Sequence, residues 1–163
     1  MDILLSTVLI GIGATVATDL WALLRHRLFA VPPPNYGLVG RWIGHMPQGR
    51  FVHDSIAAAT PVAGERLLGW SAHYLIGVVF AAILVALFGA GWLQQPTLLP
   101  AMLVGIVTVA APYLLLQPGM GAGLAARRTP QPNKARLHSL IMHAVFGLGL
   151  YGSGLLLRAL FVF

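Results

Sequence analysis

The chain contains no cysteine and little charge: of its 163 residues, 9% are charged and only four are acidic. The absence of cysteine excludes disulfides, zinc–thiolate sites, iron–sulfur clusters and covalently attached c-type haem. Soluble domains carry about 25% charged residues, so this composition excludes a water-soluble globule. Ten basic residues on a chain that is 58% hydrophobic are also too few to predict a nucleic-acid-binding surface. The mean hydropathy of +0.82 indicates an integral membrane protein.

Four segments have the length of about 20 mainly apolar residues that a membrane-spanning helix needs. They are Ile3–Leu24, Leu67–Ala90, Leu98–Leu116 and Leu137–Leu157. The first segment lacks the positive residues that precede the apolar part of a cleaved signal peptide, so we expect it to be retained. The sequence therefore predicts an all-α membrane protein whose residues 1–163 form a single four-span domain.

The basic residues predict the orientation, because cytoplasmic loops are enriched in Lys and Arg. Nine of the ten lie in two loops, residues 25–66 and 117–136, and only Arg158 lies on the other side. We expect these two loops to be cytoplasmic and both termini to lie outside. In a bacterium the membrane would be the inner one, because proteins that span the outer membrane are β-barrels and the spans predicted here are helical.

The second and fourth spans share a pattern of Arg, Leu, five residues, His, three residues and Gly. It places His73 opposite His143 at an offset of 70, and residues 13–24 align with residues 105–116 at an offset of 92. We interpret this as two tandem repeats, each formed by a helix, a loop and a helix, that have the same orientation in the membrane.

Three titratable residues share one depth in the predicted spans. Asp19 lies six residues before Arg25, and His73 and His143 each lie seven residues after an arginine. At 1.5 Å per residue, each is about 10 Å inside the cytoplasmic boundary. Because ionisable groups at membrane depth are costly, we expect them to converge on a functional site. The neighbouring polar residues Tyr74, Tyr113 and Gln117 are expected to surround it.

Several roles for this cluster stay open. A proton relay, or a protonatable pocket for a small ligand or ion, is the leading hypothesis, and the protein would then be a possible transporter. Asp19 and the two histidines also suit iron or zinc. Alternatively, His73 and His143 are axial ligands of a b-type haem in a membrane enzyme or redox protein. A structural or interaction role without any catalytic site is the remaining alternative, so enzymatic activity stays undecided.

The first cytoplasmic loop contains residues of two further kinds. The stretch from Tyr36 to Ile43 suits a short interfacial helix with Trp42 at the level of the lipid headgroups. Arg41 and Arg50 are expected to contact lipid phosphates. A second polar cluster of His45, His53 and Asp54 is expected at the mouth of the bundle. The second loop begins with a glycine-rich run at residues 117–123, but no P-loop motif follows.

Three motifs carry a resemblance to a known family. They are NYGLVGRWIGHM at residues 35–46, PVAGERLLGWSAHY at residues 61–74 and QPGMGAG at residues 117–123. In these motifs the chain resembles the bacterial membrane family known as domain-of-unknown-function family 2938. The resemblance covers nearly the whole chain and implies a four-helix inner-membrane protein, but it implies no activity and no catalytic residue.

The number of spans and the glycines of the fourth span suggest a partner. Four helices form a thin wall for a transport path, so the sequence predicts a possible homodimer in the lipid bilayer. Gly147, Gly149, Gly152 and Gly154 offer a close-packing face either for that dimer or for the chain's own bundle.

Overall fold

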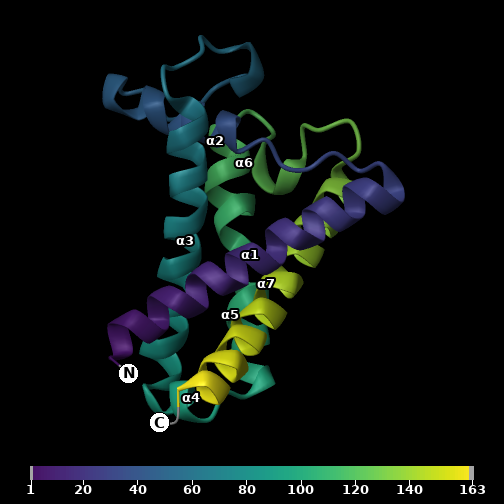
Figure 1. The fold of residues 1–163 in the computed structure, drawn as a ribbon. Coiled ribbons are helices and arrows are strands. Elements are labelled where there is room, and N and C mark those ends of the chain that lie inside the picture. The colour runs from purple at the N-terminus through teal and green to yellow at the C-terminus, as the bar shows by residue number, and fades with distance from the viewer. Residues whose placement is uncertain (1, 162–163) are drawn as a thin grey trace. The chain divides into compact units, whose positions relative to one another are not determined.

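The computed structural model describes residues 2–161, and all regular elements in this range are helices (Figure 1). The α-helices are α1 Ile3–Phe29, α2 Tyr36–His45, α3 Glu65–Phe88, α4 Gly91–Gln94, α5 Leu98–Val107, α6 Gln117–Gly119 and α7 Pro132–Leu160. Short 3₁₀ turns occur at Met46–Gln48, Ile56–Ala58 and Leu124–Ala126, and a π-helical segment at Pro112–Leu116. Within residues 2–161, four helical segments are long and apolar enough to cross a membrane: Ile3–Phe29, Glu65–Phe88, Leu98–Gly119, which comprises α5, the π-helical segment and α6, and Pro132–Leu160. The prediction of an all-α chain with four such helices is therefore confirmed.

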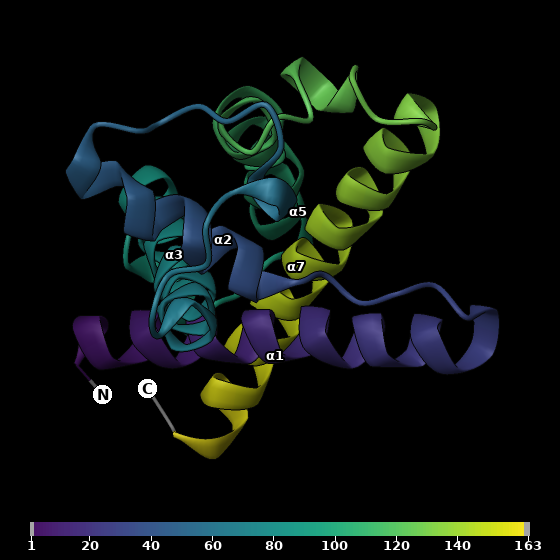
Figure 2. The same cartoon turned by 90° about the horizontal axis from the view of Figure 1, so that it is seen from above.

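The long helix α1 continues past the predicted end of the first span. Figure 2 shows α1 as one long continuous helix. It includes Arg25 and Arg27 and ends where Ala30 takes a left-handed conformation with φ of 53°. Arginine is a good helix former, so the basic residues mark a change in polarity and do not end the helix. The first proline of the chain is Pro32, which lies after the end of α1. The fourth span likewise starts at Pro132, so Lys134 and Arg136 lie in a helix instead of the predicted loop.

The third span, predicted from Leu98 to Leu116, is interrupted in the structure. Residues 108–109 form a turn after α5, and Pro112–Leu116 form a π-helical turn before α6. Pro112 has no N–H to donate to the carbonyl of residue 108, which opens the regular ladder of hydrogen bonds. The amide of Tyr113 donates to the carbonyl of Val109 at 3.1 Å, so a hydrogen bond between residues four apart forms again directly after Pro112.

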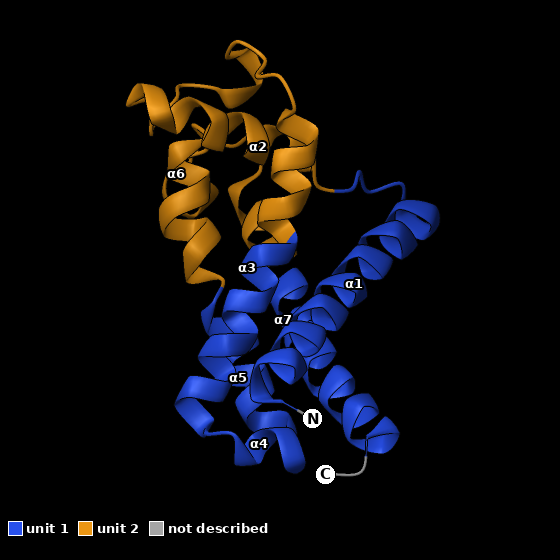
Figure 3. Ribbon diagram, turned by 60° about the vertical axis from the view of Figure 1, so that its left-hand side comes forward, with its two compact units in different colours: residues 1–33, 74–108, 141–163 blue, residues 34–73, 109–140 orange. Residues whose placement is uncertain are grey.

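The described chain separates into two compact units, coloured in Figure 3. Unit 1 contains residues 1–33, 74–108 and 141–163, and unit 2 contains residues 34–73 and 109–140. The expected outside location of the termini falls on residues 1, 162 and 163, which lie outside the described range. The orientation of the loops and the repeat stay predictions.

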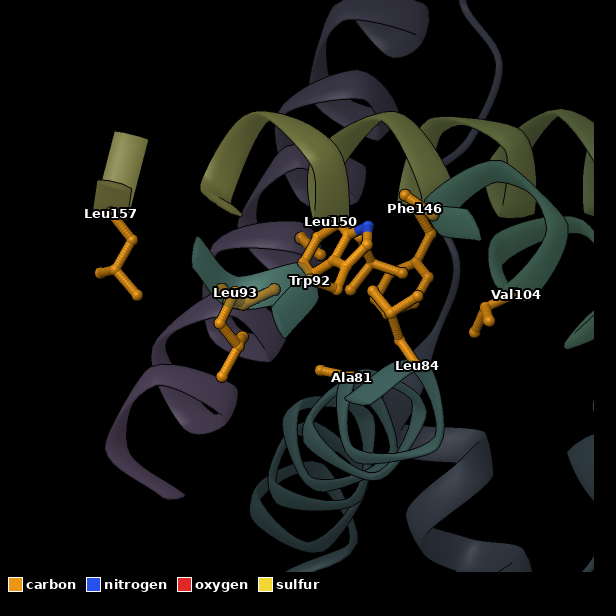
Figure 4. Close-up of a cluster of buried hydrophobic side chains, with 11 residues drawn as sticks. Ala81, Leu84, Trp92, Leu93, Val104, Phe146, Leu150 and Leu157 are labelled. Carbon is orange, nitrogen blue, oxygen red and sulfur yellow. The ribbon is translucent and has the colours of Figure 1, made fainter. Parts of the chain in front are cut away.

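Unit 1 is held by a core that all its helices share. Its buried apolar side chains form one cluster that includes Trp92 (Figure 4). The indole of Trp92 is 5% exposed, and its Nε1 donates to the carbonyl of Thr97 at 3.1 Å. These side chains come from α1 (Ile10, Ala14), α3 (Ala81, Leu84), α4 (Leu93), α5 (Ala101, Val104) and α7 (Phe146, Leu150, Leu157). Burying them in this way fixes which face of each long helix is directed inward.

Glycines allow the helices of unit 1 to approach one another. A Cβ atom on Gly11 of α1 would lie 2.5 Å from the Cα of Val78 on α3. A Cβ on Gly105 of α5 would lie 2.5 Å from the Cα of Gly147 on α7. Both contacts are with backbone, which cannot turn aside as a side chain can. Close approach through small residues is the usual way in which membrane helices associate.

Unit 2 joins α2 to the beginning of α3. The side chain of Asn35 accepts a hydrogen bond from the amide of Gly37 at 3.1 Å and so begins α2. A helix in this region was predicted from Tyr36 to Ile43, and the structure extends it to His45. The Arg41 guanidinium donates from both Nε and Nη2 to the Glu65 carboxylate at 2.8 Å. This bidentate pair connects the two helices.

Candidate functional site

Asp19 and Tyr74 form a hydrogen bond between two candidate spans of unit 1. The Tyr74 hydroxyl donates to Oδ2 of Asp19 at 2.9 Å, which links α1 to α3. Both residues are half-buried. The sequence predicted Asp19 as the centre of the site and Tyr74 as a neighbour, and the structure brings these two together. A tyrosine hydroxyl can donate or accept, so it is suited to a carboxyl group that changes its protonation state.

His143 has a different set of partners in unit 1. Its Nδ1 lies 3.2 Å from the carbonyl oxygen of Gly105 and 3.1 Å from Oγ1 of Thr108. A carbonyl can only accept, and the Thr108 hydroxyl already donates to the same carbonyl at 2.7 Å. Nδ1 therefore carries the proton in this hydrogen-bonded group, and Nε2 of a neutral His143 is free to accept one.

His73 belongs to unit 2, in an aromatic group with Tyr36 and Trp70. Its ring stacks on Tyr36 with the centroids 3.9 Å apart and the planes 21° apart, and Trp70 meets Tyr36 edge-on at 4.8 Å. The predicted trio of Asp19, His73 and His143 is therefore divided between the units, two residues in unit 1 and one in unit 2. Its convergence stays a prediction.

Tyr113 and Gln117 were expected near the same site, and both belong to unit 2. The Tyr113 hydroxyl donates to the carbonyl of Arg136 at 2.6 Å, which ties the π-helical turn to α7. Nε2 of Gln117 donates to the hydroxyl of Ser139 at 3.3 Å, and its Oε1 is buried without a hydrogen-bond partner in the described chain. These contacts hold the second loop against the start of α7.

The second predicted cluster is partly assembled in unit 2. The rings of His45 and His53 lie 5.1 Å apart, and His45 donates from Nε2 to the carbonyl of Thr60 at 2.9 Å. Nδ1 of His45 and Nε2 of His53 are buried without partners among residues 2–161. Asp54, the third member of the predicted cluster, is exposed. Its backbone carbonyl lies next to Gly121.

The predicted metal site gains no support from the geometry. Within the described range, no group of three or more His, Asp or Glu side chains is arranged to hold a metal ion. Asp19, His73 and His143 as metal ligands, and the two histidines as haem ligands, therefore stay predictions.

The residues proposed to contact lipid headgroups differ in their surroundings. Besides Glu65, Arg41 binds the carbonyls of Ala57 at 3.2 Å and Ala59 at 3.1 Å, so its donors already have partners within unit 2. The Glu65 carboxylate also raises the pKa of Arg41. Trp42 donates from Nε1 to the carbonyl of Phe51 at 2.8 Å, and Arg50 is exposed.

Two features of the site were missed by reasoning from the sequence. Thr108 holds the ring of His143, but a threonine inside an apolar run gives no signal of its own. Arg25 was counted only as a loop charge, whereas the structure buries it. Its spacing from the buried residues Thr18 and Ala22 on the same helix face was the available signal.

Comparison with known proteins gives one finding. A family model matches residues 8–157 of the chain, and the family is described as "Protein of unknown function (DUF2938)". The chain belongs to this family. The resemblance seen in the loop motifs is thus confirmed, and the description of the family assigns no activity. Neither the search of curated proteins nor the search of solved structures found a match.

Proposed function

We propose that this family member is a multi-pass protein of a bacterial inner membrane that moves a small solute or ion together with a proton. The observation that carries the proposal is the 2.9 Å hydrogen bond from Tyr74 on α3 to Asp19 on α1. A carboxyl group at membrane depth is by default a functional group, because its insertion is costly.

A purely structural role explains this pair less well. Insertion of a central Asp costs roughly 2.5–3.5 kcal/mol, whereas a hydrogen bond between membrane helices contributes about 0.6 kcal/mol on average. Asparagine or serine can form such a bond at a lower cost. The excess cost supports a role that requires a group able to lose and regain a proton.

The pair also provides a physical link between proton uptake and helix contact. An ionised Asp19 accepts from the Tyr74 hydroxyl, but a protonated carboxyl group has a donor of its own. When Asp19 takes up a proton, the hydrogen bond between α1 and α3 can reverse its direction. His143, with Nε2 available in its neutral form, adds a second proton acceptor on α7.

The proposal includes the orientation that the basic residues predict. Loops 25–66 and 117–136 then face the cytoplasm, and Asp19 lies in the cytoplasmic half of its span. A homodimer would give the transport path a thicker wall. Of the fourth-span glycines, Gly152 is the one with open space around it, whereas Gly147, Gly149 and Gly154 meet neighbouring atoms of the chain.

The first test measures protonation without a ligand. Difference infrared spectroscopy of the purified protein in lipid, titrated over roughly pH 4 to 9, should show a carboxyl signal that Asp19→Asn removes. Asp2→Asn is the matched control, because Asp2 precedes the same helix and is exposed. If the signal of Asp19 is absent over this range, the carboxyl group exchanges no proton and the proposal is wrong.

The second test measures transport. Proteoliposomes with an entrapped pH-sensitive dye receive an imposed pH gradient and then Na⁺, K⁺, acetate, phosphate or an amino acid in turn. At least one solute should speed the decay of the gradient in the wild type and in Asp2→Asn, but not in Asp19→Asn. Equal decay in all three proteins and in empty vesicles for every solute would favour the structural alternative.

A further inference from the structure

Near its C-terminal end, α1 carries two buried donor groups for which residues 2–161 supply no acceptor. Arg25 is 8% exposed, and its Nε is buried without a hydrogen-bond partner among the described residues. The indole Nε1 of Trp21 is also buried and has no hydrogen-bond partner among these residues. These two atoms are the unpartnered buried donors of unit 1, and neither takes part in the hydrogen bond between Asp19 and Tyr74.

The arginine is the more demanding of the two. Its guanidinium stays charged at every accessible pH, and all its hydrogen-bonding groups are donors. Proteins bury such a charge only when it is paired, because removing it from water without a partner costs several kcal/mol. Arg25 is buried and its Nε has no acceptor among residues 2–161, so the side chain lacks the anion that usually pairs with a buried guanidinium.

The acidic residues nearest in the chain do not supply that anion. Asp19 lies six residues before Arg25 and binds Tyr74, and Asp2 lies at the opposite end of the same helix. Glu65 is occupied by Arg41. Arg25 forms no ion pair with any residue in the range 2–161.

The positions of Trp21 and Arg25 match the needs of one ligand. Residues four apart lie on one face of a helix, one turn above the other. Long side chains in a helix lean toward its N-terminus, so Arg25 reaches back over the turn that carries Trp21. An indole N–H and a guanidinium on one helix face present only donors, and a guanidinium can bind two oxygens of a phosphate or carboxylate at once.

We propose that Trp21 and Arg25 form a binding site for an anionic oxygen group, a phosphate or a carboxylate, at the C-terminal end of α1. The inference goes beyond the proposed function and does not depend on proton exchange at Asp19. The anion has two sources with the same chemistry, namely a soluble anion such as inorganic phosphate and the headgroup of an anionic lipid.

Thermal unfolding of the delipidated protein in an uncharged detergent tests the site. Inorganic phosphate, titrated at constant ionic strength against chloride, should raise the melting temperature. The half-saturating phosphate concentration should rise about tenfold or more in Arg25→Gln and about threefold in Trp21→Phe, which keeps the ring but loses the donor. Arg27→Gln is the matched control, because Arg27 is exposed two residues further along the same helix.

A second arm replaces phosphate with mixed micelles that contain phosphatidylglycerol, compared with micelles that contain a phosphate-free diacylglycerol. Stabilisation by the phospholipid alone, with the same order of variants, identifies a lipid headgroup as the anion. Stabilisation by inorganic phosphate identifies a soluble one.

The ligand-free proteins provide a check that does not require the variants to bind anything. Without an anion, Arg25→Gln should melt at a higher temperature than the wild type, because an unpaired buried charge has been removed. Saturating anion should reverse this order. Asp19→Asn should respond to the anion as the wild type does, which separates this site from the proposed proton site.

Two results would overturn the inference. The first is a wild type that responds to neither phosphate nor phosphatidylglycerol. The second is a response that Arg27→Gln weakens as much as Arg25→Gln does, which would indicate general charge attraction to the end of the helix.

Discussion

At the scale of single residues, the polar groups in the spans differ in how their hydrogen bonds are satisfied. Thr15 and Thr18 donate to carbonyls of their own helix at 2.8 and 2.7 Å. Asp19 and His143 instead bind residues of neighbouring helices. Arg25 and Trp21 each have a buried donor atom that finds no acceptor in the part of the chain that the structure describes. Unlike the two threonines, these four residues depend on a partner outside their own helix. The proposed function rests on Asp19 and His143, and the proposed anion site rests on Arg25 and Trp21.

The bond between Tyr74 and Asp19 predicts a small loss of stability in Tyr74→Phe. The variant keeps the ring and removes the hydroxyl, so the free energy of unfolding should fall by about 1 kcal/mol. Unfolding in sodium dodecyl sulfate measures it. Tyr151→Phe is the control, because the Tyr151 ring packs against the core of unit 1 and its hydroxyl makes no hydrogen bond within residues 2–161. Equal losses in both variants would show that the bond to Asp19 contributes nothing.

The sequence predicted part of this residue-level pattern. Counting residues from the flanking arginines gives the depth of Asp19, and Tyr74 on α3 lies at a similar depth, so a contact between them was accessible to reasoning. Depth does not give the rotation of each helix about its axis, since that depends on packing. The hydroxyl of Thr108 beside His143 and the burial of Arg25 therefore appeared only in the structure.

At the scale of helices, glycines determine which faces meet. The contact between α1 and α3 involves Gly11 and Gly77, and the contact between α5 and α7 involves Gly105 and Gly147. Two helix pairs in unit 1 are thus packed through glycine in the same manner. In the predicted repeat, Gly77 is equivalent to Gly147, but Gly105 is equivalent to Gly13 and not to Gly11, so the repeat stays a prediction.

Alanine in place of glycine should have opposite effects at two of these positions. Gly105→Ala places a methyl group against the Gly147 backbone and should lower the free energy of unfolding by about 1–3 kcal/mol. Gly152→Ala meets open space and should raise it by up to about 1 kcal/mol, because alanine favours the helix. The same unfolding assay compares the two. A stabilised Gly105→Ala would show that α5 and α7 do not approach as closely as described.

The long helices could be predicted because each contains an apolar run long enough to span a membrane. The ends of these helices could not be predicted, since Arg25 and Arg136 belong to helices although their charge suggested loops. The turn and the π-helical segment in the third span depend on Pro112. The sequence shows that a proline lies there, but several local geometries can restore the missing hydrogen bond.

At the scale of the whole molecule, the absence of cysteine makes the orientation testable without background. Single substitutions Gln95→Cys and Gln131→Cys place one thiol in the short loop after α4 and one in the loop before α7, at exposed positions. In right-side-out vesicles a membrane-impermeant maleimide should label Gln95→Cys and spare Gln131→Cys. Inside-out vesicles should show the reverse. Labelling of both from one side would contradict the four-span arrangement.

The threonines and serine of α1 have a consequence for how the protein is made. Ser6 and Thr7 donate to the carbonyls of Asp2 and Ile3, four residues earlier, at 2.9 and 2.8 Å. Thr15 and Thr18 also bind within the helix. Because these hydroxyls need no neighbour, most of the first span can leave the ribosome and enter lipid before the later spans have been synthesised. Asp19 lacks this independence, because it binds Tyr74 of α3, and so does Arg25 if it binds the proposed anion. On the two proposals, the nascent chain must keep both residues near the aqueous boundary until these partners are present.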